Sequence, residues 1–178
     1  MRRIVEPRPS AGRLDPRLDR AAHDAAIDRV GPGFRLRLLQ FFVPRTTPFF
    51  VWYYRRTGSD ARRVTEALPV LLLTTIGRRS GRPRTVALFH LPDGESVIVA
   101  GGNCARRALP AWVHNLHSEP TAEIEIGRER VRVTAEFLEG IEWDQHWRRL
   151  VAAKPDFEEA PRIAGRHIPL VRLRPAWR

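Results

Sequence analysis

The sequence is almost without cysteine, lysine and methionine. Of its 178 residues, one is cysteine (Cys104), one is lysine (Lys154) and one is methionine. A single cysteine excludes an internal disulfide framework and any zinc site built from several cysteines, and it fits a reducing cytoplasm. No apolar run approaches the roughly 20 residues that a membrane-spanning helix needs. We therefore expect a cytoplasmic protein without a transmembrane helix.

The histidines lack the spacing of metal ligands. The six are His23, His90, His114, His117, His146 and His167. Only His114 and His117 lie close together, and no carboxylate completes a ligand set with them. The sequence also has no nucleophile elbow, Walker loop or dinucleotide fingerprint. We expect no metal ion and no covalent nucleophile.

Positive charge is in excess and is unevenly distributed. Thirty-one Lys and Arg oppose 20 Asp and Glu, a formal charge of +11. Residues 1–65 carry 14 basic and 6 acidic residues (+8), whereas residues 66–178 carry 17 and 14 (+3). A basic surface attracts nucleic acid, an anionic membrane or a phosphorylated cofactor. Because most of the excess lies in the first part, the second part need not bind a long polyanion.

We interpret residues 1–65 as a basic helical extension. Residues 14–30 have a weakly apolar helical pattern, and residues 34–56 combine many aromatic side chains with arginines. Pro44 and Pro48 would divide the second stretch into short helices. Such a stretch either packs on the main domain, which we favour, or makes peripheral contact with a membrane through residues 34–56.

From residue 66 the pattern becomes that of short strands. The expected strands are residues 70–75, 85–91, 96–100, 121–126, 130–138 and 168–173, and the expected helices are residues 108–116 and 141–152. Turn residues such as Pro92-Asp93-Gly94 separate them. Several antiparallel strands with few helices predict a mainly β fold with flanking helices, a small barrel or sandwich, over residues 66–178.

The loop over residues 77–84 is the most informative stretch. It places Arg78, Arg79, Arg82 and Arg84 between two apolar strands, together with two glycines and Ser80. Glycines let backbone N–H groups converge on an anion, and arginines offer forked donors to phosphate or carboxylate. The alternative is a solvated hairpin. Gly81-Arg82-Pro83 also resembles an AT-hook core, but such hooks lie in disordered segments, so we expect no nucleic-acid partner.

Two further stretches could contact a cofactor. The small residues of Ala100-Gly101-Gly102 would let a flat ring approach the backbone. Trp112 and Asn115 share one face of the helix that follows, where the first could wall a cofactor and the second orient it. A tryptophan is more often part of the core, and a lone histidine such as His114 is more often structural than a proton donor.

In this order, the stretches LLLTTIGRRSGRPR, VIVAGG and PAWVHNL, with an IP-x-V strand near the end, resemble the deazaflavin-dependent nitroreductase and F420H2-dependent quinone reductase family. The resemblance covers about residues 68–175. It implies a split β-barrel of the flavin-reductase or FMN-binding type. It also implies that coenzyme F420, an 8-hydroxy-5-deazaflavin with a phosphate and an acidic tail, transfers hydride to a quinone, nitroaromatic or activated alkene. The alternative is a non-catalytic carrier or sensor that binds FMN or haem.

The resemblance also implies a role for particular residues. The residues implied to bind the phosphate and tail are Arg78, Arg79, Ser80 and Arg84. Those implied to lie along the cofactor are Thr85, Val86, Ala87, Leu88 and Phe89, and those at the ring are Ala100, Gly101 and Gly102. The short helix that closes over the cofactor is implied to contribute Ala111, Trp112, Val113, His114 and Asn115, of which His114 would act as the catalytic proton donor. The substrate pocket is implied to contain Lys154, Phe157 and Ala160.

The sequence departs from the family at several of these positions. Val86-Ala87 stand where the family commonly has Asn or Thr followed by Pro, and Asn103 replaces a frequent lysine. Gly102 replaces a serine near the ring. Well-studied nitroreductases have tyrosines near Lys154, Phe157 and Ala160, and two of these three are not aromatic here. These departures weaken the prediction of the acceptor more than the prediction of the cofactor. We expect a small-molecule acceptor, and we expect the protein to be a monomer or a homodimer.

Overall fold

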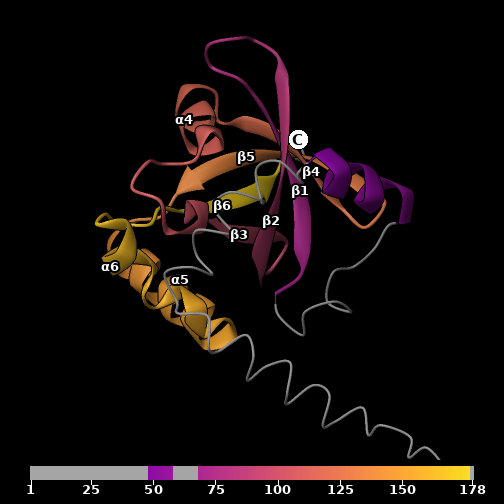
Figure 1. Cartoon of the computed structure of the whole chain (residues 1–178). Helices are drawn as coiled ribbons and strands as arrows, with labels where there is room; N and C mark the ends of the chain where they lie inside the picture. The colour runs from indigo at the N-terminus through magenta and orange to yellow at the C-terminus, as the bar shows by residue number, and fades with distance from the viewer. Residues whose placement is uncertain (1–47, 58–67, 177–178) are drawn as a thin grey trace, which may run out of the picture. The chain divides into compact units, whose positions relative to one another are not determined.

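Six antiparallel strands close into a barrel (Figure 1). The computed structural model describes residues 48–57 and 68–176, all of which belong to the compact unit Leu38–Arg178. The strands are β1 (Val70–Ile76), β2 (Pro83–Asp93), β3 (Ser96–Ala100), β4 (Thr121–Ile126), β5 (Glu129–Phe137) and β6 (Leu170–Pro175). Their order around the barrel is β1–β2–β3–β6–β5–β4. The prediction of a mainly β barrel with flanking helices is confirmed.

Short helices flank the barrel. They are α4 (Ala111–Ser118), α5 (Gly140–Ala153) and α6 (Ala160–Ala164), the 3-10 turns η1 (Asn103–Ala105) and η2 (Pro155–Phe157), and a helix over residues 48–57. Among these residues no helix has both the length and the apolar character needed to cross a membrane. The helix expected over residues 14–30 lies outside the described residues. So does most of the 34–56 stretch, whose membrane contact stays a prediction.

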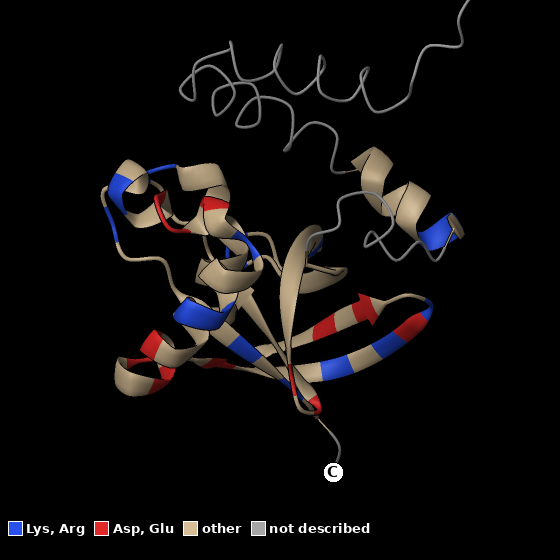
Figure 2. Ribbon diagram, turned by 90° about the horizontal axis from the view of Figure 1, so that it is seen from below, with Lys and Arg blue, Asp and Glu red and all other residues tan. Residues whose placement is uncertain are grey.

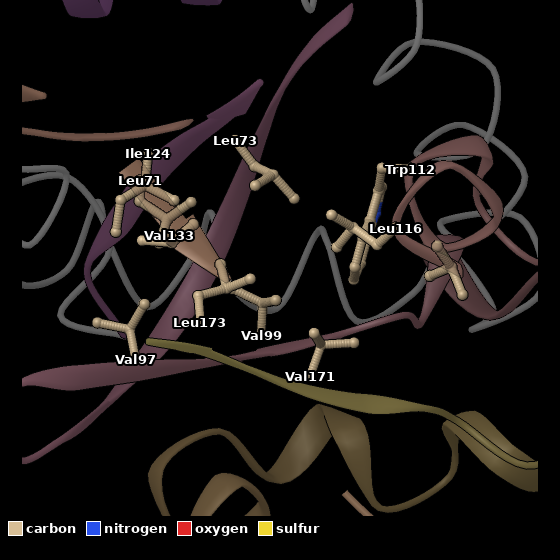
Figure 3. Close-up of a cluster of buried hydrophobic side chains, with 11 residues drawn as sticks. Leu71, Leu73, Val97, Val99, Trp112, Leu116, Ile124, Val133, Val171 and Leu173 are labelled. Atoms are coloured by element: carbon tan, nitrogen blue, oxygen red, sulfur yellow. The ribbon is translucent and has the colours of Figure 1, made fainter. Parts of the chain in front are cut away.

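The barrel interior is filled by alternate residues of its strands, as the two-residue period of a strand requires (Figure 3). The contributors are Leu71, Leu73, Val97, Val99, Ile124, Val133, Val171 and Leu173. Helix α4 directs Trp112 and Leu116 toward the same cluster. The barrel is therefore a packed core, and α4 is held against it by the side chains that complete that core.

Strand β1 is apolar on both faces because both faces are covered. Leu71 and Leu73 face the interior, whereas Val70 and Leu72 pack with Tyr54 of the 48–57 helix. The Tyr54 hydroxyl donates to the Val70 carbonyl (3.1 Å) and accepts from the Gly127 N–H (2.8 Å). This double covering explains why the β1 sequence is a continuous apolar run rather than an alternating one.

Charged side chains pair on the outer surface of the barrel. Figure 2 shows acidic and basic residues on the neighbouring strands β4 and β5, where Glu123 lies opposite Arg132 and Glu125 opposite Arg130. Glu125 is 5% exposed and also binds the guanidinium of Arg55 from the 48–57 helix. Among these residues Arg130 pairs with both Glu123 and Glu125, so part of the charge on this side of the barrel is neutralised.

Helix α5 covers the side of the barrel formed by β3 and β6. Leu150 packs against Ile98 and Leu170, and two stacked tryptophans of α5 lie beside them (5.0 Å between ring centroids). The buried guanidinium of Arg172 on β6 binds Asp93 and the α5 carboxylate Glu142. Apolar packing and a charged cluster together fix α5 on the barrel.

Several element boundaries differ from the prediction, three of them for a clear physical reason. Strand β2 extends through Asp93, which pairs with Ser96, so Gly94-Glu95 rather than Pro92-Asp93-Gly94 forms the turn. Helix α4 begins at Ala111 because Pro110 is extended. Strand β6 covers Leu170–Pro175 rather than residues 168–173, since Ile168 packs against α6 before the strand begins.

Candidate functional site

The loop between β1 and β2 is a tight hairpin held by its own backbone. The Gly77 carbonyl accepts hydrogen bonds from the N–H groups of Ser80 (3.0 Å) and Gly81 (2.8 Å), and the Gly77 N–H donates to Arg82 O (2.9 Å). Gly81 has a φ of +63°, which favours glycine. A Cβ on Gly77 would lie 2.7 Å from Ser80 Oγ. Both glycines are therefore needed by the turn itself.

This hairpin displays four guanidinium groups to solvent. Arg78, Arg79, Arg82 and Arg84 are all exposed. Within residues 48–57 and 68–176, none of these side chains forms an ion pair or a hydrogen bond. This is unlike Arg130 of β5 and Arg172 and Arg174 of β6, which pair with carboxylates. A cluster of unpaired guanidinium groups suits a ligand with several phosphate or carboxylate groups.

Asn115 of α4 connects this hairpin to the rest of the fold. Its side chain is 4% exposed, and its Oδ1 accepts a hydrogen bond from the Arg78 N–H (3.1 Å). Its Nδ2 donates to Thr75 Oγ1 (2.9 Å). Two of the predicted site segments thus lie together. Thr75 was missed by the sequence analysis because a threonine within a strand gives no local signal.

Trp112 and Val113 are placed mainly in the core. Trp112 is 5% exposed and Val113 is fully buried. Val113 Cγ2 lies 3.0 Å from the position that a Cβ on Gly101 would occupy, and Pro169 Cγ lies 2.7 Å from it. Gly101 is therefore required by contacts within the protein, and its predicted contact with a flat ring stays a prediction. The wall role of Trp112 stays a prediction.

The conditions at Gly102 are different. Its backbone has φ −68° and ψ −35°, which any residue adopts, and the nearest atom to an added Cβ is Phe157 Cε1 at 3.6 Å. Unlike Gly101, Gly102 therefore has room for a small side chain. The ring of Phe157 lies next to that space at an ordinary contact distance.

The predicted substrate-pocket residues lie beside the predicted ring segment. Phe157, Phe89 and Ala100 pack around one apolar cluster, and the Lys154 ammonium lies 5.4 Å from the centroid of the Phe89 ring. Ala160 belongs to a second cluster against which Ala100 also packs. The fold brings together segments that are separated by more than 50 positions in the sequence.

The predicted segment Thr85–Phe89 does not present all five side chains on one side. Val86 and Leu88 pack against the barrel interior, whereas Ala87 and Phe89 pack on the outer face. Thr85 Oγ1 is hydrogen-bonded to Thr74 Oγ1 across the strand pair (2.8 Å). Because strand residues alternate, a molecule that lies along one face of β2 contacts only every second side chain.

The ring segment continues into an unusual turn. Asn103, Cys104 and Ala105 have φ values of 51°, 50° and 54°, the left-handed region. The turn is closed by Ala105 N–H to Gly102 O (2.9 Å) and Arg106 N–H to Asn103 O (3.1 Å). This conformation costs non-glycine residues about 1–2 kcal/mol each and rarely occurs in succession. Neighbouring contacts must stabilise it.

Arg166 supplies such contacts. Its Nη2 donates to Gly101 O (3.0 Å), Gly102 O (3.2 Å) and Ala108 O (3.5 Å), and its Nε donates to Arg106 O (3.1 Å). Burial lowers the pKa of this guanidinium. The sequence analysis missed Arg166, since it is one of 30 arginines and its partners lie about 60 positions away.

Comparison with known proteins shows which family the chain belongs to. A family profile described as F420H(2)-dependent quinone reductase matches residues 47–175. The chain belongs to this family. An F420H(2)-dependent quinone reductase from Mycobacterium tuberculosis is 37% identical over 83 residues, which span 46% of this chain and 56% of that relative. A second M. tuberculosis protein, named for the same activity, is 33% identical over 120 residues, 67% of this chain and 98% of its own length.

Solved structures agree with the quinone reductase fold. One whose title reads F420-H2 dependent reductase (FDR-A) has a TM-score of 0.51 and 29% identity, covering 58% of this chain and 92% of that one. Another, titled as a domain-swapped dimer, has a TM-score of 0.55 and 25% identity, covering 71% and 94%. These structures support the split-barrel architecture expected from the sequence.

Two of the chain's differences from the quinone reductase pattern now have a location. Gly102, where the resemblance predicts the loss of a serine, lies against Phe157, and Lys154, near which nitroreductases are expected to have a tyrosine, lies over Phe89. Half-buried His114 lies on α4, and its role as proton donor stays a prediction. Over residues 48–57 and 68–176, no three His, Cys, Asp or Glu side chains gather as metal ligands do.

Proposed function

We propose that this chain binds coenzyme F420 and catalyses the F420H2-dependent reduction of a quinone. The observation that carries the proposal is the arginine hairpin, residues 77–84, whose four guanidinium groups lack partners in the described residues. Asn115 holds the backbone of this hairpin against α4, so the cationic groups project from an ordered base. The family membership supplies the cofactor class, and the hairpin supplies the chemistry that would recognise it.

The residues present fit that cofactor. F420 carries one phosphate and several tail carboxylates, and each is an acceptor for a guanidinium fork. Arg78, Arg79 and Arg84 would hold these groups, with help from the Ser80 hydroxyl. The backbone of residues 100–102 would lie at the deazaflavin ring. When bound in its reduced form, the cofactor supplies a hydride from its C5 carbon.

The chain itself orients the acceptor and manages its charge. A quinone that gains a hydride carries negative charge on oxygen, which nearby donors stabilise. The N–H groups of Gly102 and Asn103 would serve as such donors, together with the Lys154 ammonium, which also donates to Asp156 Oδ2 (2.8 Å). His114 would deliver the proton that completes reduction. Phe89 and Phe157 would provide apolar surface for a flat ring.

We propose quinones ahead of the other acceptors. Quinones accept a hydride at oxygen and need one cationic or N–H donor, which Lys154 supplies. Nitroaromatics and activated alkenes are the less favoured acceptors, since Lys154 and Ala160 stand where well-studied nitroreductases have tyrosines. A quinone and a nitroaromatic of similar size, assayed side by side, would rank the classes.

A fluorescence titration with oxidised F420 tests the cofactor, with FMN and a nicotinamide as comparisons. We expect micromolar or tighter binding of F420 alone. The double variant Arg78→Glu/Arg84→Glu should weaken F420 at least 100-fold and FMN much less, because FMN lacks the acidic tail. The exposed pair Arg128→Glu/Arg148→Glu, which changes the net charge equally, should weaken F420 less than threefold. Equal losses in the two double variants would contradict the assignment of the hairpin.

The second candidate is a carrier or sensor that binds F420, FMN or haem without turnover. The replacement of pocket tyrosines by Lys154 and Ala160 is the observation that favours it. F420 binding with no oxidation of F420H2 by any quinone would establish this candidate. Light scattering in the same buffer would distinguish a monomer from the homodimer.

A further inference from the structure

The left-handed turn at Asn103–Ala105 needs an explanation outside its own sequence. None of the three residues is glycine, and all have φ near +50°. Such conformations persist where the surrounding structure fixes them, and they are found at functional sites. The turn directly follows Gly102, the residue beside Phe157.

The carbonyls on both sides of the turn converge on one side chain. Arg166 donates to Gly101 O and Gly102 O before the turn and to Arg106 O and Ala108 O after it, at 3.0 to 3.5 Å. Asn103 Nδ2 adds a bond to Ala108 O (2.8 Å). The guanidinium thus links the start of the turn to its end.

Helix α6 delivers Arg166 to this position. The helix ends at Gly165, which has a φ of 61° and reverses the chain so that Arg166 follows immediately. The Arg166 N–H donates to Pro161 O (3.2 Å), which anchors its backbone to α6. The contacts come from two nitrogens of one plane, Nη2 and Nε, whereas lysine has a single ammonium, so lysine cannot substitute fully.

The bound carbonyls determine where the neighbouring N–H groups point. Gly102 has right-handed and Asn103 left-handed backbone angles, a succession that turns consecutive N–H groups toward one side. Within the described residues, the N–H groups of Gly102 and Asn103 have no acceptor. They are therefore available to the ring or the acceptor.

We propose that Arg166 is a positioning residue that holds the left-handed turn 103–105 and thereby sets the N–H groups of the ring segment. It acts through the backbone and does not itself touch the cofactor. The proposal rests on the proposed function for the identity of the ligand. The role of Arg166 in holding the turn does not depend on which ligand the protein binds.

The test uses Arg166→Gln and Arg166→Lys, with Arg162→Gln as the matched control on α6, where Arg162 is exposed and pairs with Glu159. Ala105→Gly lowers the cost of the left-handed conformation. The probes are oxidised F420 and a deazaflavin riboside that lacks the phosphate and tail. Hydrogen exchange of the apoprotein reports the turn and the barrel strands separately.

We expect Arg166→Gln to weaken both probes at least tenfold and to speed exchange at residues 102–106 but not in β1 or β4. The affinities and exchange rates of Arg166→Lys should lie between those of Arg166→Gln and wild type, and those of Arg162→Gln should match wild type. Adding Ala105→Gly to Arg166→Gln should recover several-fold in affinity. The hairpin variant Arg78→Glu/Arg84→Glu should weaken F420 but leave the riboside unchanged.

Three results would overturn the proposal: binding within twofold of wild type in Arg166→Gln, faster exchange throughout the barrel, or no recovery from Ala105→Gly. If Arg166→Gln does not fold, Arg166→Lys with and without Ala105→Gly decides by the same criteria. Failure of wild type to bind F420 would instead refute the proposed function, while the exchange data would still test the role of Arg166 in the turn.

Discussion

Arg78 and Asn115, which are 37 positions apart in the sequence, are joined by a hydrogen bond from the Arg78 N–H to Asn115 Oδ1 (3.1 Å). The same carboxamide donates to Thr75 (2.9 Å) and is almost fully buried. One side chain therefore determines where the arginine hairpin lies relative to α4. The electrostatic part of the proposed site depends on an uncharged residue.

Replacing Asn115 by alanine should destabilise the protein by about 1–3 kcal/mol, because the Arg78 N–H and the Thr75 hydroxyl lose their partner. Urea denaturation measures this change. Thr75→Val in the Asn115→Ala background should cost less than it does alone, since the hydroxyl is already unpaired. Full additivity of the two changes would contradict the coupling.

The two adjacent glycines should differ in how well they tolerate a side chain. Gly101→Ala places a Cβ 2.7 Å from Pro169 Cγ, and we expect a loss of about 1–3 kcal/mol. Gly102→Ser has ordinary contact distances and a permitted backbone, so its effect on stability should be within about 0.5 kcal/mol. Thermal unfolding of the pair checks this. Equal destabilisation of both variants would contradict the different surroundings of the two positions.

Removing the Tyr54 hydroxyl should loosen the 48–57 helix. Tyr54→Phe leaves the Gly127 N–H without its acceptor and should cost about 1–3 kcal/mol. Tyr53→Phe is the control, because Tyr53 is 44% exposed, and it should be neutral. The measurement is chemical denaturation of both variants. A neutral Tyr54→Phe would show that apolar packing alone holds the helix.

Acid should weaken the cluster around Arg172. Burial raises the pKa of Asp93, but hydrogen bonds from Arg149 and Arg172 outweigh this effect and leave the pKa below its ordinary 3.8. In Glu136, burial likewise raises the pKa, while Arg174 and Arg172 lower it below 4.5. Because both folded-state pKa values are depressed, the stabilisation is complete above the ordinary values and is lost as the pH falls through the folded ones.

The free energy of unfolding should therefore decrease as the pH is lowered from about 5 to 3. Asp93→Asn should be less stable than wild type at pH 7, and its decrease over the same interval should be shallower. Denaturation at several pH values measures both slopes. Parallel curves for the variant and wild type would exclude Asp93 as a contributor.

The fold was largely predictable, because its local signals agree with its tertiary contacts. The interior positions of β1, β3 and β6 are apolar at every second residue, and Gly94 and Gly127 mark hairpins with positive φ. The start of β6 was not predictable. Ile168 is as apolar as a strand residue but is buried by α6, a contact that the local pattern does not encode.

The candidate site was predictable only in part. The arginine hairpin is identified by its composition, whereas the contact between Phe157 and the Gly102 position is known only from the structure. The contributions of Thr75 and Arg166 arise from contacts between distant segments. The left-handed turn carries no glycine, and although asparagine tolerates a positive φ, Cys104 and Ala105 give no local signal for it.

The covering of β1 has a practical consequence for anyone who divides this chain. Val70 and Leu72 are buried, and on the outer face of the barrel Tyr54 packs beside them. A fragment that began at residue 66 would leave this apolar strip open to water, along with the carboxylate of Glu125 stripped of Arg55. Such a strip favours self-association. Because residues 48–57 cover this strip, fragments made for expression should retain them.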